Sequence, residues 1–74
     1  MEEIFSERLR DILWHAKMTQ QELAEKTGLT AAAISHYVNG KQCPHSTALI
    51  LIADVLNVSI DYLLGRTKRQ NILR

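Results

Sequence analysis

The side chains of this chain that most often bind metals or act as nucleophiles are three histidines and one cysteine: His15, His36, Cys43 and His45. The Cys43-x-His45 pair does not have the spacing of a structural zinc site, and further ligands would have to converge from separate helices. We interpret Cys43 as a small loop residue. The sequence therefore predicts no metal site and no cofactor.

The acidic side chains do not form a catalytic arrangement either. Acid–base chemistry needs paired carboxylates in a cleft, or a nucleophile beside a base. Asp54 and Asp61 are expected on the surfaces of different helices. With no predicted loop longer than about five residues, a domain of this size has no sheltered pocket. We predict that the chain is not an enzyme and has no small-molecule ligand.

Residues that begin and end helices form the clearest pattern in the chain. Thr19 and Glu22 have the spacing of a capping box, in which each side chain bonds the other residue's backbone N–H. Thr30 is placed to begin a second helix in the same way. Gly28 lies between the two helices and readily adopts the left-handed conformation that ends a helix. The Asn-Gly pair at 39–40 is placed to end the second one. Two short helices joined through a glycine are typical of a helix-turn-helix.

The periodicity of apolar residues predicts further helices around this pair. No alternating pattern typical of strands, no internal repeat and no low-complexity segment competes with them. The fold class is therefore all-α, with helices expected over residues 4–16, 20–27, 31–39, 45–56 and 60–64.

The segment 45–56 has more apolar residues than one helix face needs. Four of them form a stripe that can face a core: Leu49, Ile52, Ala53 and Leu56. Ile50, Leu51 and Val55 are additional to this stripe. Either a small core uses them all, or they are the dimer contacts of a homodimer.

Composition and charge limit the classes of protein that remain. The chain has 74 residues, a net charge of +1 and one cysteine, which fits one small domain in a reducing compartment, so we expect it to be cytoplasmic. No apolar run approaches the roughly 18 residues of a membrane span, and the acidic N-terminus lacks a signal-peptide core. We therefore expect no membrane partner.

The charge is unevenly distributed along the chain. Residues 1–65 contain five basic and eight acidic residues, whereas residues 66–74 contain four basic residues and no acidic one. We divide the chain into a domain over 1–65 and a basic C-terminal tail over 66–74. The tail is either a solvated end or an arm that contacts phosphate groups of a partner.

Taken together, these motifs resemble the Cro and phage-repressor (XRE) family of helix-turn-helix proteins. The resemblance rests on TQQELAEKTGLTAAAISHYVNGK, on the Pro44 that follows, and on the segments LILIADVL and NVSIDYLLG, and it covers roughly residues 5–65. It implies the compact five-helix bundle of the lambda-repressor-like DNA-binding domain, with the helix-turn-helix over about 20–39.

The resemblance also implies roles for individual residues. Gln20, Asn39 and Lys41 stand where family members contact the DNA backbone. The start of the helix 31–39 would enter the major groove of double-stranded DNA. Its base-reading face is then Thr30, Ala31, Ala32, Ser35 and His36.

Two features of this chain depart from the family pattern. Many members pair an arginine of the first helix with a glutamate of the third, and the matching positions here are Leu13 and Val38. Replacing both charges by apolar residues is often neutral or stabilising, so we expect an intact fold. The reading face is also poor in hydrogen-bonding groups, because Ala31 and Ala32 offer only apolar contact with a thymine methyl.

These features predict a sequence-specific DNA-binding transcription regulator that acts as a homodimer. A repressor of a phage, mobile element or bacterial operon is the role we expect. The alternative is a protein-interaction module, an antitoxin or adaptor, built on the same fold. The alanines of the third helix, the acidic character of residues 1–65 and the additional apolar residues favour it.

Overall fold

The computed structural model describes residues 2–66, with side chains from residue 4 onward. These residues form only helices and turns, which confirms the predicted all-α class. The helices are α1 (Glu2–Ala16), α2 (Gln20–Thr27), α3 (Ala31–Val38), α4 (Ser46–Leu56) and α5 (Ile60–Leu63). Each boundary lies within two residues of its predicted position. Of the predicted basic tail, residues 67–74 lie outside the described part.

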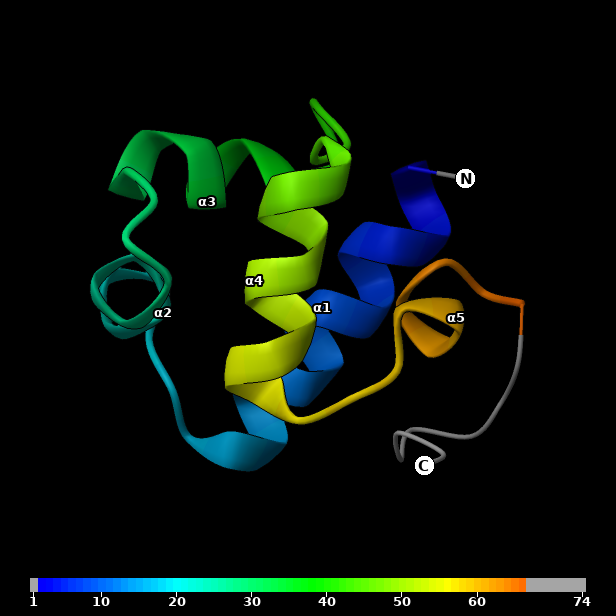
Figure 1. The fold of residues 1–74 in the computed structure, drawn as a ribbon, viewed down its shortest axis with the longest axis horizontal. Helices are drawn as coiled ribbons and strands as arrows, with labels where there is room; N and C mark the ends of the chain where they lie inside the picture. Colours follow the sequence, from blue (N-terminus) through cyan, green and yellow to red (C-terminus); the bar gives the residue numbers. More distant parts are fainter. Residues whose placement is uncertain (1, 67–74) are drawn as a thin grey trace.

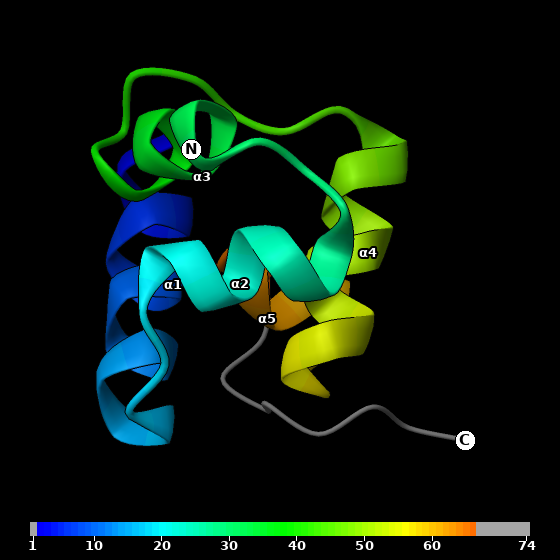
Figure 2. The same ribbon diagram turned by 90° about the vertical axis from the view of Figure 1, so that its left-hand side faces the viewer.

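The helices surround one core to which all five contribute. Helix α2 packs against α3 and α4, and α1 packs against α3 and α5. Figure 2 shows α2 crossing between α1 and α4, with α3 above it. The largest fully buried side chains come from every helix: Phe5, Leu9, Leu23, Ile34, Ile52 and Leu63. This single core holds α2 and α3, the helix-turn-helix, in place. Figure 1 shows how the five helices are arranged.

The predicted caps fix where the helices begin. The Thr19 hydroxyl accepts a hydrogen bond from the Glu22 N–H at 3.0 Å, and the Glu22 carboxylate accepts one from the Thr19 N–H at 3.1 Å. The Thr30 hydroxyl accepts from the Ala33 N–H at 3.1 Å. Both helices of the helix-turn-helix therefore start where their local sequence predicts.

The helix ends use left-handed residues, and two of these are not glycine. Gly28 ends α2 at φ 78°, as predicted. Lys17 ends α1 at φ 55° and Asn57 ends α4 at φ 56°. Behind Lys17, the Met18 N–H donates to the Leu13 carbonyl at 3.0 Å, which closes the last turn of α1.

Helix α5 is short and is held against α1 by two close approaches. The Arg8 guanidinium lies 4.2 Å from the centre of the Tyr62 ring and donates to the Tyr62 carbonyl at 3.0 Å. At the end of α5, a Cβ added to Gly65 would lie 2.6 Å from Ile4 Cγ2. A Cβ at this position would therefore require the Ile4 side chain to shift.

Candidate nucleic-acid interface

Helix α3 buries one face and exposes the other. Its buried side chains are Ile34, Tyr37 and Val38. Tyr37 packs edge-on against Phe5 of α1, with ring centres 6.5 Å apart. These inward contacts fix the rotation of α3 about its own axis, and so they determine which residues it presents to a partner.

The predicted base-reading residues lie on the opposite face of α3 or at its start. The exposed ones are Thr30, Ala31, Ala32 and His36, and Ser35 is half-buried. The helix contains no carboxylate, so it would add no like-charge repulsion to an approaching phosphate. Small side chains at its first turn let the helix backbone come close to a partner surface.

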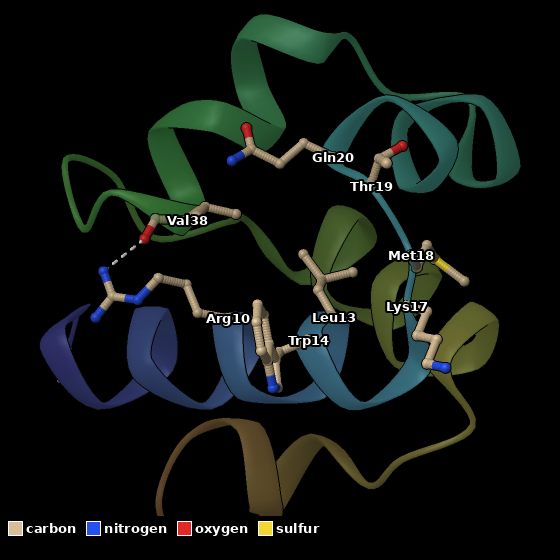
Figure 3. A pocket seen from close by; sticks show the side chains of 8 residues that line it. All are labelled: Arg10, Leu13, Trp14, Lys17, Met18, Thr19, Gln20 and Val38. Atoms are coloured by element: carbon tan, nitrogen blue, oxygen red, sulfur yellow. Dashed lines mark hydrogen bonds between the residues drawn. The ribbon is translucent and has the colours of Figure 1, made fainter.

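The residues predicted to contact the DNA backbone lie at the edges of this face. Gln20 is the first residue of α2 and is exposed, and its side chain extends toward α3 in Figure 3. Lys41 is exposed just beyond α3, where its backbone N–H donates to the His36 carbonyl at 2.9 Å. Gln20 thus lies near one end of α3 and Lys41 near the other. In helix-turn-helix proteins, residues at such positions contact the phosphates of the duplex while the helix between them enters the major groove.

One hydrogen bond joins the two predicted classes of contact residue. The Asn39 side-chain amide donates to the Ser35 hydroxyl at 3.2 Å. The Ser35 O–H can still donate to a base, because a hydroxyl both donates and accepts. The four-residue spacing of the two residues permits this bond on a helix, but we did not predict it because many side-chain pairs share that spacing.

The expected apolar replacement of the family's ion pair is present. Leu13 and Val38 are both buried, at 6% and 5% exposure. A further link between α1 and α3 was not predicted: the Arg10 guanidinium donates to the Val38 carbonyl at 3.2 Å (Figure 3). Its acceptor is a backbone carbonyl, and the side-chain types at the two positions therefore gave no signal for it.

The three candidate dimer contacts differ in exposure. Ile50 and Leu51 of α4 are 48% and 36% exposed, which is unusual for such large apolar side chains. Val55 is half-buried and packs against the core. Ile50 and Leu51 therefore remain available for a second chain, and Val55 belongs mainly to the domain's own core.

The histidines and cysteine do not gather around a common point. Within residues 2–66, no group of three or more histidine, cysteine, aspartate or glutamate side chains could hold a metal ion. His15 instead lies 3.4 Å from the carboxylate of Asp11 on the surface of α1. Over the same residues, no helix combines the length and the apolar character needed to cross a bilayer.

Comparison with known proteins gives matches of sequence. The profile of the helix-turn-helix family matches residues 8–63. Among curated proteins, the chain is 37% identical over 71 residues to the uncharacterized HTH-type transcriptional regulator YqaE of Bacillus subtilis, covering 96% of this chain and 61% of that protein. It is 35% identical over 60 residues to the cryptic phage CTXphi transcriptional repressor RstR of Vibrio cholerae, covering 81% and 54%.

A third relative is named as an activator, whereas RstR is named as a repressor. The HTH-type transcriptional activator BcrR of Enterococcus faecalis is 35% identical over 61 residues, which is 82% of this chain and 30% of that protein. The chain thus spans less than two thirds of the length of each of these three relatives. No solved structure matched the chain significantly.

The family profile covers most of the chain, and the capped α2, the glycine turn and α3 all lie within the residues it matches. The chain therefore belongs to the helix-turn-helix family of transcription regulators, of the Cro and phage-repressor (XRE) type.

Proposed function

We propose that this chain is the DNA-binding unit of a transcription regulator and reads an operator with α3 in the major groove. The observation that supports this best is the solvent-exposed face of α3, which has no carboxylate and is flanked by Gln20 and Lys41. An acidic or covered face would argue against a nucleic acid. Repression by occupying an operator is the role we favour, and the similarity to a phage repressor supports it.

We further propose that the chain binds as a homodimer through α4. Ile50 and Leu51 are the exposed apolar side chains that a twofold interface would bury. A dimer would place two copies of α3 one DNA turn apart, about 34 Å, and would add the affinities of two modules.

Readout by this face depends on few hydrogen bonds. Thr30, Ser35 and His36 can donate to base edges, whereas Ala31 and Ala32 can contact thymine methyl groups. We therefore expect an operator rich in A·T pairs at the half-sites, with part of the specificity coming from DNA deformability.

The test is selection of binding sites from random double-stranded DNA, followed by gel-shift titration of the selected site at low salt. We expect one enriched, twofold-symmetric sequence. The variant Ala32→Glu, which adds a carboxylate to the exposed face, should abolish binding by charge repulsion. The control His15→Glu adds the same charge to α1, away from the face, and should change affinity little.

A protein-interaction module is the second candidate function. The alanines of α3 and the exposed Ile50, Leu51 and Trp14 favour it, because apolar surface of this kind is common where proteins meet. Selection that enriches no DNA sequence at any salt concentration would support this candidate and contradict operator recognition.

A further inference from the structure

A groove of about 650 Å³ lies beside the α3 face, between α1, the turn into α2 and the end of α3 (Figure 3). Leu13 and Val38 form its buried floor, with the half-buried Met18 next to them. Trp14 stands at its edge and is 80% exposed, which is exceptional for the largest apolar side chain in the chain. None of the proposed base-reading residues lines this groove.

The charged side chains that line the groove are both cations. Arg10 and Trp14 lie on one stripe of α1, at positions i and i+4, and Lys17 follows directly after the end of the helix. In Figure 3 the indole of Trp14 lies between the Arg10 and Lys17 side chains. No carboxylate lines the groove, although α1 itself carries acidic residues on other faces. Charge complementarity therefore favours, as the ligand of this groove, an extended anion that also has an apolar portion.

The groove is continuous with the proposed DNA interface. Thr19 and Gln20 form its wall on the α2 side, and Gln20 is also the residue placed to contact a phosphate there. A strand whose phosphate reaches Gln20 would continue along α1 past Trp14. An extended polyanion can contact the two cations on either side of Trp14 at the same time.

We propose that this groove binds the sugar–phosphate backbone of one DNA strand. Lys17 and Arg10 contact phosphates, and the Trp14 ring packs against a deoxyribose, with its indole N–H available as a donor. The guanidinium of Arg10 keeps N–H groups for a phosphate while one bonds Val38, because it has five. The proposal rests on the proposed DNA-binding function and adds to it a second contact surface.

Trp14 is the only tryptophan of the chain, so its fluorescence reports on this groove alone. The experiment titrates the chain with double-stranded DNA carrying a fluorescent label, chosen not to overlap tryptophan emission. Anisotropy of the label measures binding, and Trp14 emission and acrylamide quenching measure burial of the indole. We expect the emission to change along the same binding curve, and the indole to become protected from acrylamide.

Two pairs of variants test the individual contacts. Lys17→Gln should reduce the slope of log K against log salt by about 0.9, the value for one lost phosphate contact, whereas Lys26→Gln at the other end of α2 should leave the slope unchanged. Trp14→Ala should weaken binding at least about fivefold, and Trp14→Phe, which keeps a ring, should weaken it less. All three substituted side chains are exposed, so the variants should fold.

The outcomes separate this proposal from the function on which it rests. If the label shows no binding to any DNA, both are wrong. If DNA binds with unchanged Trp14 emission and an unchanged salt slope for Lys17→Gln, only the groove proposal is wrong. A change of Trp14 emission with protein concentration in the absence of DNA would assign the groove to a protein contact and would also overturn it.

Discussion

Lys17 shows how a single residue can hold a conformation that its type disfavours. It ends α1 at φ 55°, where a side chain with a Cβ crowds the backbone at a cost of about 1–2 kcal/mol. Glycine has no such cost in the folded state, although it loses more chain entropy on folding. The surrounding contacts, including the Met18 to Leu13 hydrogen bond, hold Lys17 in place.

We therefore expect Lys17→Gly to stabilise the domain by roughly 0.5–1 kcal/mol, the difference between relieved strain and added chain entropy. Chemical denaturation should show a higher midpoint with an unchanged slope. The matched control is Asn57→Gly at φ 56°, which should gain less because asparagine tolerates this conformation. A lower midpoint for Lys17→Gly would contradict the strain.

Individual residues also show which features of the site can be predicted from the sequence and which cannot. Caps such as Thr19 and Thr30 were predictable because each cap depends on residues within three positions of it. The exposure of Ala31 and His36 followed from helical periodicity. The Arg10 to Val38 and Asn39 to Ser35 bonds were not predicted. The first depends on how α1 and α3 pack, and the second is one choice among several equivalent spacings.

At the scale of the element, α3 depends on one side-chain cap. The Thr30 hydroxyl satisfies the Ala33 N–H, and α3 has only eight residues. Short helices have little stability of their own, so we expect the loss of this cap to lower the free energy of unfolding of the whole domain.

Thr30→Ala should lower the free energy of unfolding by about 1 kcal/mol, the usual cost of losing a cap. The control Thr47→Ala replaces an exposed threonine inside α4, where alanine has the higher helix propensity, and it should be neutral or slightly stabilising. Thermal unfolding without DNA measures both variants. Equal melting temperatures for the two would show that the cap contributes nothing.

The two glycines at φ 78° separate backbone conformation from packing. A Cβ at Gly28 would meet nothing within 4 Å, whereas a Cβ at Gly65 would lie 2.6 Å from Ile4. Gly28→Ala should therefore cost only the left-handed strain, about 1–2 kcal/mol. Gly65→Ala should cost a further 1–3 kcal/mol, roughly, from overpacking against α1. The denaturation midpoint should therefore fall more for Gly65→Ala than for Gly28→Ala. Adding Ile4→Ala to Gly65→Ala should recover part of the lost stability. A smaller loss for Gly65→Ala than for Gly28→Ala would show that Ile4 moves aside at little cost.

At the scale of the whole molecule, the exposed side chains of α4 determine whether the chain acts alone. Leu51→Glu should dissociate the proposed dimer, because a carboxylate would be buried at its interface without a partner. Sedimentation velocity should change from dimer to monomer, and operator affinity should fall at least about tenfold as the second module is lost. Asp54→Ser changes an exposed residue of the same helix and serves as the control. A wild-type chain that sediments as a monomer at all concentrations would refute the dimer.

The order and type of the helices were predictable from the sequence, because all five carry local start or stop signals or a clear apolar stripe. The division of the apolar residues of α4 between core and surface was left open. It depends on where α2 and α5 pack on α4, which the period of one helix does not specify. The structure assigns Val55 mainly to the core and leaves Ile50 and Leu51 exposed.

The sharing of one core by all five helices has a genetic consequence. Leu63 lies in a helix of four residues that takes no part in the proposed DNA contacts, yet it is fully buried with Ile34 of α3 in the same core. Leu63→Ala should cost roughly 2–5 kcal/mol, a large part of the stability of so small a domain. Such an allele would lose regulation at high growth temperature and recover it on cooling, whereas an allele such as Ala32→Glu would fail at every temperature. Temperature sensitivity in a reporter strain would thus sort mutations of the core from mutations of the reading face.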